Sequence, residues 1–153
     1  MTEAKLEAAL AEKIRALSLA GVAVHGFFET APAGDVAGME SFEDSATIEV
    51  VAQNREMTAW ELPQYDFPIN IQLVSRVETD KGAAGHVARC GALAGLLAAY
   101  CARGGSTNLR TDFSIEGEFT PAMANVSGGA NEYDDEAGTR TWSQTFTIRG
   151  YTL

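Results

Sequence analysis

Four segments of this sequence alternate apolar and polar residues with a period of two, and that alternation limits the fold more than any other feature. The segments span residues 47–53, 68–78, 112–120 and 141–151. Successive side chains of a β-strand point to opposite faces of a sheet, so each segment predicts a strand with one apolar and one polar face. Strands of this kind are typical of an antiparallel sheet that is covered on one side only.

Two segments with the helical period are expected to supply that cover. An apolar stripe runs along residues 3–17 at three- and four-residue steps, through Leu6, Leu10, Ile14 and Leu17, with Thr2 as the expected N-cap. A second helix is expected over residues 83–102, and a first strand over 22–29. The predicted order is α-β-β-β-α-β-β. We therefore expect an α+β fold, with a mainly antiparallel sheet of four to five strands and two helices packed on one face.

The predicted helix over residues 83–102 has no polar side. Its bulky side is expected to consist of Val87, Cys90, Leu93, Ala94, Leu97 and Cys101. The opposite side is expected to hold glycine and alanine only, with Gly91 and Gly95 in mid-helix. A helix that is apolar all round is expected to be buried all round, so a second element must approach the small side. Two candidates are the first helix of the same chain and a neighbouring subunit, and Gly91 and Gly95 are then candidate interface residues.

Two long connections are predicted outside these elements. Residues 30–46 carry little periodicity, and a loop of that length is either mobile or functional. Residues 121–138 contain several acids and are too long for a tight turn, so we expect either an extended acidic arm that projects into solvent or an ordinary flexible surface loop.

Composition limits the class of function. The 153 residues, 46 % of them hydrophobic, suit one domain spanning 1–153 with one core, without a metal or disulfide as support. A formal net charge of −10 disfavours binding to nucleic acid or to an anionic membrane surface. The sequence has neither the pattern of a signal peptide nor an uncharged apolar stretch long enough to span a membrane.

The two cysteines are expected to be unpaired. Cys90 and Cys101 lie eleven residues apart in one predicted helix. A rise of about 1.5 Å per residue separates their Cα atoms by roughly 16 Å, whereas a disulfide requires less than about 7 Å.

The residues that carry chemistry are sparse. His25 and His86 are the only histidines, too few for the three or four converging ligands of a metal site, and no phosphate-binding glycine loop is present. His86 and Cys90 are four residues apart on a helix and can touch, so a Cys–His nucleophilic pair is conceivable, although nothing in the sequence orients the histidine. We therefore predict no catalytic, metal or cofactor-binding residues and no enzyme activity. The alternative is a small α+β ligand-binding domain or an enzyme of unknown substrate.

The layout resembles a known family. After the amphipathic N-terminal helix, the quoted features are a strand ending in RVETD, a helix reading HVARCGALAGLLAAY, then FSIEGEF, a long loop and a final strand TRTWSQTFTIRGY. This arrangement is similar to the tail terminator and tail-completion proteins of long-tailed bacteriophages and prophages. The likeness covers residues 1–20 and 47–153, while the long 30–46 segment departs from it.

The resemblance implies a structural virion protein of the tail or neck, made in the cytoplasm of the host bacterium. Such proteins form a ring, usually of six copies, that caps the tail tube and joins it to the head or neck, and DNA passes through without specific binding. Ring contacts that run head to tail require two different complementary patches on each copy. Candidate contacts with acidic loops of a neighbour are Arg76, Arg110, Arg140 and Arg149, for which the alternative is ordinary surface salt bridging.

Overall fold

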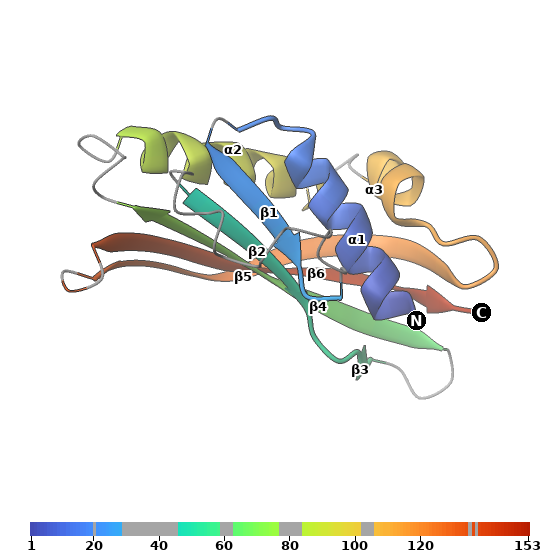
Figure 1. Ribbon diagram of the computed structural model, residues 1–153. Helices are drawn as coiled ribbons and strands as arrows, with labels where there is room; N and C mark the ends of the chain where they lie inside the picture. Colours follow the sequence, from blue (N-terminus) through green and yellow to red (C-terminus); the bar gives the residue numbers. More distant parts are fainter. Residues whose placement is uncertain are drawn as a thin grey trace.

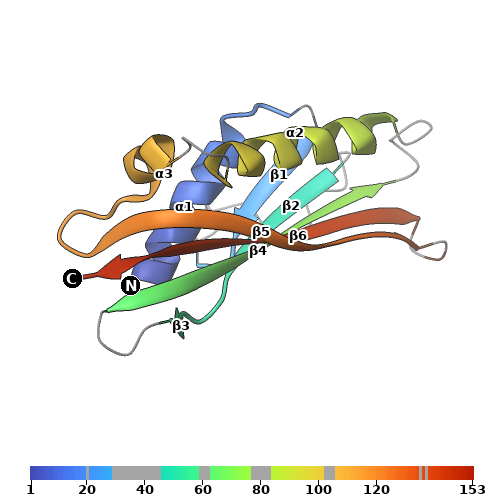
Figure 2. The same ribbon diagram turned by 180° about the vertical axis from the view of Figure 1, so that it is seen from behind.

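The computed structural model describes residues 1–19, 21–28, 46–58, 63–76, 84–101, 106–134, 136 and 138–153. The elements in chain order are α1 (Thr2–Arg15), β1 (Val22–Gly26), β2 (Ala46–Ala52), β3 (Glu56–Met57), β4 (Gln64–Arg76), α2 (Ala84–Cys101), α3 (Ser106–Phe113), β5 (Phe119–Asp134) and β6 (Thr139–Thr152). The three described helices lie on one face of the sheet, and none of them covers the other face (Figure 1, Figure 2). The predicted α+β class and the one-sided cover are confirmed.

The sheet has six strands rather than four or five. Its order is β1-β2-β4-β6-β5, and the short β3 pairs with β4. All pairings are antiparallel except β1 with β2, which run parallel. The first strand ends at Gly26, short of the predicted end, and the expected 30–46 loop lies almost wholly outside the described residues. Two-residue β3 escaped prediction because it is too short to show a period.

The core lies between the sheet and the helices, as the alternation predicts. In β4, every second side chain from Phe67 to Ser75 has an exposed fraction of 1 % or less. Three members of the predicted α1 stripe, Leu6, Leu10 and Ile14, are equally buried, while Leu17 lies beyond the helix end and is half-buried. None of the described helices is long and apolar enough to cross a membrane.

The predicted strand over residues 112–120 is wrong. Residues 106–113 form α3, and β5 begins only at Phe119. Leu109 and Phe113 are both buried and stand four residues apart, which is one helical turn, so the packing of α3 follows the helical period. A chain reversal follows, closed by a bridge between Ile115 and Phe119. The alternating pattern over residues 112–120 therefore runs from the end of α3 through the chain reversal into the start of β5.

The connection expected over residues 121–138 is also wrong in its structure. Most of it belongs to β5, which pairs with β6 along its whole length, and the two strands form one long hairpin. Two register shifts, at Pro121/Met123 and at Ser127/Ala130, add one residue each to β5. Gly128 and Gly129 have φ angles of 67° and 134°, which suit glycine and permit the second bulge. The expectation that this segment projects into solvent holds, because every residue from Asn125 to Asp134 is exposed.

One buried carboxylate joins α1 to the strand ends. Glu7 is fully buried, and its two oxygens accept backbone N–H bonds from Phe28 at 2.7 Å and from Ala52 at 2.9 Å. These donors follow β1 and end β2, so a single side chain satisfies the ends of both parallel strands. Thr2 is the first residue of α1 rather than its cap, which is Met1, and its hydroxyl donates instead to Glu118 at 2.9 Å.

Candidate assembly surfaces

Helix α2 turns a different set of side chains inward from the one predicted. It lies over β5 and β6, whereas α1 lies over β1 and β2 (Figure 1). Leu93 and Leu97 are fully buried as expected, and Tyr100 joins them against the rings of Phe113 and Phe146. Val87, expected on the buried side, is 67 % exposed, because His86 and Arg89 occupy the inward positions of the first turns.

The outward side of α2 is uncharged, and no described element covers it. It consists of small residues and one valine: Val87, Ala88, Gly91, Ala94, Gly95 and Ala98. A methyl group built on Gly91 or Gly95 would meet nothing within 4 Å outside the helix backbone. Of the two partners considered for this side, the first helix of the same chain is therefore wrong. Within the described part of the chain nothing replaces it, so Gly91 and Gly95 remain open for a neighbouring molecule.

The two edges of the sheet differ. At the β1 edge, the Arg15 guanidinium donates to the Val24 carbonyl at 2.9 Å, so one edge acceptor is already bound. At the β5 edge, the ten exposed residues from Asn125 to Asp134 receive no cover from a described element. An unprotected strand edge offers backbone groups to another chain, and β5 is the edge that this molecule leaves open.

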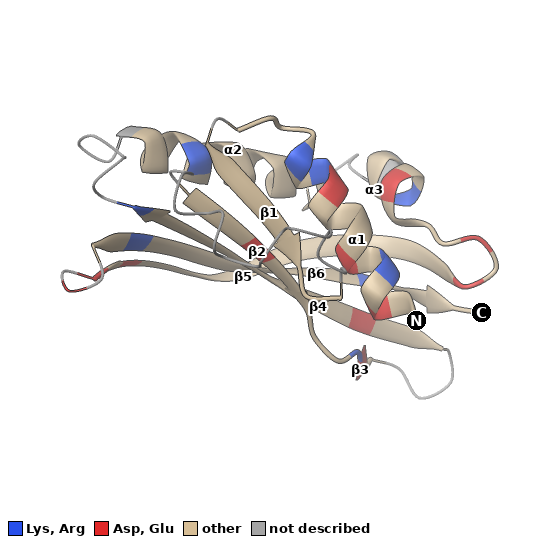
Figure 3. Ribbon diagram, in the orientation of Figure 1, with Lys and Arg blue, Asp and Glu red and all other residues tan. Residues whose placement is uncertain are grey.

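The exposed end of the hairpin is acidic. Glu132 and Asp134 end β5, and Glu136 lies in the turn, where its backbone N–H donates to the Asp134 carboxylate at 3.0 Å. Figure 3 shows this acidic tip at one end of the molecule, while α3 lies at the opposite end.

The four candidate arginines have different surroundings. Arg149 donates two hydrogen bonds to Asp66, at 2.8 and 3.0 Å, and the pKa of Arg149 is raised by those bonds and by the charge of the carboxylate. Arg140 lies over the Tyr133 ring at 5.4 Å and keeps a buried Nη1 without a hydrogen-bond partner. Arg76 is half-buried at the end of β4. Arg110 is exposed on α3 and pairs with no carboxylate among the described residues, so of these four it is the most available to a neighbour.

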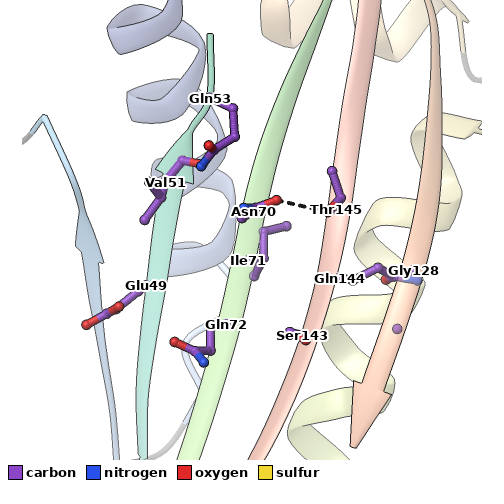
Figure 4. A pocket seen from close by; sticks show the side chains of 11 residues that line it. Glu49, Val51, Gln53, Asn70, Ile71, Gln72, Gly128, Ser143, Gln144 and Thr145 are labelled. Carbon is purple, nitrogen blue, oxygen red and sulfur yellow. Dashed lines mark hydrogen bonds between the residues drawn. The ribbon is translucent and has the colours of Figure 1, made fainter.

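The bare face of the sheet carries a shallow hollow of about 440 Å³ (Figure 4). Its walls are mainly amide and hydroxyl side chains with one carboxylate, contributed by β2, β4, β6 and the β5 bulge. The polar members are Glu49, Gln53, Asn70, Gln72, Ser143, Gln144 and Thr145. Thr145 donates to Asn70 at 2.9 Å, which ties two neighbouring strands on this face. The lining contains no cation, so it does not attract a phosphate group.

The conceivable Cys–His pair does form. Cys90 Sγ lies 3.5 Å from His86 Nε2, and His86 Nδ1 lies 2.8 Å from the hydroxyl of Ser75 on β4. Ser75 also accepts a hydrogen bond from Arg89 at 3.1 Å, so the histidine is oriented by a strand residue that sequence reasoning missed. His25 is half-buried in β1. Neither cysteine forms a disulfide, and no group of three or more metal-ligating side chains occurs among the residues that the structure describes.

A polar contact also fixes the end of α2 against α3. The Tyr100 hydroxyl donates to the Asp112 carboxylate at 2.6 Å. Burial raises the pKa of Tyr100 strongly, and the hydrogen bond and charge of Asp112 raise it further, so the phenol keeps its proton and the contact persists across the physiological range.

Comparison with known proteins identifies a shared fold. The sequence matches no protein-family model and no curated protein. Among solved structures, a chain from the virion of a native gene transfer agent particle superposes with a TM-score of 0.55 and 16 % identity, over 95 % of this chain and 93 % of that one. A second solved chain matches with a TM-score of 0.48 and 15 % identity, over 96 % and 91 %, which is too low to argue from. The first match shows the fold alone.

Proposed function

We propose that this chain is a structural protein of a bacteriophage-like virion and does no catalysis. The observation that carries the proposal is the open, uncharged side of α2, which a protein that assembles can cover and a protein that stays single leaves in water. The shared fold supports it, because the matching chain belongs to a virion particle and the two chains match over nearly their whole lengths.

Within that class, the finer proposal is a tail terminator or completion protein. Copies of the chain form a ring, six in the family it resembles, at the end of the tail tube, with tail-tube and head or neck proteins as partners. The residues that contact the next copy are then Gly91 and Gly95, since the absence of side chains there permits close approach of a second backbone.

A ring also needs an unlike patch at the other side of each contact, and charge offers one. Arg110 on α3 and the acidic hairpin tip lie at opposite ends of the molecule (Figure 3). In a head-to-tail arrangement, the tip of one copy then faces Arg110 of the next. Arg76, Arg140 and Arg149 serve mainly inside their own chain under this arrangement.

DNA passes through the ring without being bound. The net charge of −10 repels phosphate, and the hollow on the bare sheet face presents amides, hydroxyls and Glu49. With this hollow turned toward the lumen, a duplex meets no cation in its lining.

Electron micrographs of the purified chain in negative stain test the proposal. Rings of uniform diameter are expected, and Gly95→Trp, which places an indole on the proposed contact, should abolish them while the circular dichroism spectrum stays the same. Single particles of monomer size at high concentration, together with a gene that does not neighbour tail-tube genes, would contradict it.

A further inference from the structure

The cluster beneath the first turns of α2 joins a sulfur nucleophile to an oriented base. Cys90 and His86 stand one helical turn apart on α2, and their Sγ and Nε2 atoms are 3.5 Å apart. The other imidazole nitrogen is bound to Ser75 on β4, and Arg89 binds the same hydroxyl. The histidine is 6 % exposed and Arg89 is 8 % exposed, whereas Cys90 is half-buried and so retains contact with solvent.

These contacts suit proton transfer from the thiol. When His86 Nδ1–H donates to Ser75, the lone pair of Nε2 points at the sulfur and can accept its proton. The guanidinium of Arg89, bound to the same serine, adds a positive charge close to the pair. A thiol beside an imidazole and a cation forms thiolate more readily than a thiol in apolar surroundings.

We propose that Cys90 is a nucleophilic thiol and a modification site for soft carbon electrophiles, with His86 as its base. In the reaction, the thiol proton passes to His86 Nε2 and the sulfur forms a bond to the electrophilic carbon. With a haloacetamide, the carbon–halogen bond breaks and halide leaves, so no oxidant or reductant is needed. The observations behind this site are contacts between α2 and β4, and they do not depend on the assembly proposed above.

The chain contains its own control. Cys101 lies on the same helix, is also half-buried and, like Cys90, forms no disulfide. No histidine contacts it among the described residues, and burial raises its pKa. Both thiols therefore lie on one helix of the same molecule and react under the same conditions, so they differ only in the groups around the sulfur.

The experiment measures alkylation of the full wild-type chain by limiting iodoacetamide at neutral pH. Trypsin leaves both thiols in one peptide, between Arg89 and Arg103, and fragment mass spectrometry separates them. Cys90 should react roughly tenfold faster than Cys101, given a larger thiolate fraction partly offset by lower intrinsic nucleophilicity. In concentrated guanidinium chloride the two rates should become equal. A native rate for Cys90 equal to or below that for Cys101 would overturn the proposal.

Two variants separate activation from simple exposure. His86→Gln removes the base, and Ser75→Ala removes the group that orients it, and each should lower the Cys90 rate several-fold while leaving the Cys101 rate unchanged. Thermal unfolding of both variants checks that they are folded at the temperature of the assay. If Cys90 stays fast in folded Ser75→Ala and His86→Gln, its reactivity reflects exposure alone and the proposal is wrong.

Discussion

The α1 half and the α2 half of this molecule use their interaction groups differently. On the α1 side, Glu7 binds two strand-end N–H groups and Arg15 binds a carbonyl of the edge strand. On the α2 side, no described residue covers the helix at Gly91 or Gly95, and the distal half of β5 is exposed along ten residues. The α2 half also has internal contacts, such as that of Tyr100 with Asp112, but its outward helix side and the distal β5 edge stay exposed.

Under the proposed function, the α1 half serves mainly the folding of the single chain, and the outward side of α2 serves assembly. Gly91 and Gly95 each cost about 1 kcal/mol of helix stability relative to alanine, and no described residue packs closely against them in compensation. Glycines that lower helix stability without a packing gain in the single chain are expected where a partner packs against them. Substitutions on the two sides should therefore act on different observables.

The largest effect is expected at Glu7. Glu7→Ala leaves the N–H groups of Phe28 and Ala52 without their acceptor, so the free energy of unfolding should fall by about 3 kcal/mol. Urea unfolding followed by circular dichroism measures it. The exposed Glu12→Ala on the same helix is the matched control and should change stability by less than about 0.5 kcal/mol. Equal losses in both variants would show that Glu7 has no special role.

Two glycine-to-alanine substitutions give a second test, because they should change stability in opposite directions. A Cβ at Gly150 would overlap the Thr120 carbonyl and the Phe119 ring, so Gly150→Ala should destabilise the chain by about 1–3 kcal/mol. Gly95→Ala, in open space, should stabilise it by about 1 kcal/mol, or a rise of roughly 2–4 °C in Tm. Differential scanning calorimetry on dilute protein compares them. Destabilisation by Gly95→Ala would mean that α2 is already packed on that side.

Charge reversal separates the two classes of arginine. Arg149→Glu breaks the bond to Asp66 and should lower the Tm slightly without changing the assembled mass. Arg110→Glu should leave the Tm unchanged and reduce assembly, since Arg110 has no described partner within the chain. Light scattering measures the assembled mass of each variant, and thermal melts measure its Tm. Unchanged assembly in Arg110→Glu would discard the proposed contact with the acidic tip.

The smallest effect concerns pH. The pKa of Glu118 is lowered, first by its hydrogen bond from Lys5, then by that from Thr2. A carboxylate whose pKa is lower in the folded than in the unfolded state contributes stability above the unfolded value of about 4.3, and loses it as the pH falls through the folded value. Acid titration of the Tm should therefore fall less steeply for Glu118→Gln than for wild type. Parallel curves would contradict this role.

The sequence predicts the parts of the fold where one face is buried and the other is wet. The alternation of Ile69, Ile71 and Leu73 predicts β4, and the stripe of α1 is equally plain, because burial imposes the period. The distal half of β5 escaped because both of its faces are exposed, so no period marks it as a strand. The parallel β1–β2 pairing leaves no local pattern, because it depends on a distant contact.

The candidate site was predictable to a similar extent. The uncharged side of α2, and the possibility that His86 touches Cys90, both follow from helical spacing. The orienting Ser75 does not, because it lies on β4 and only the fold brings it to the helix. Glu7 was missed for the same reason: its two N–H partners come from distant strand ends.

Hydroxyl-radical footprinting combined with light scattering over a concentration series tests the central claim most directly. Val87 on α2 and Met57 on β3 are both 67 % exposed in the single chain, so each serves as the reference for the other. We predict that the ratio of oxidation at Val87 to oxidation at Met57 falls as the mass rises above 16.3 kDa. A ratio that stays constant while the mass rises, or a mass that never exceeds that of one chain, would contradict the account.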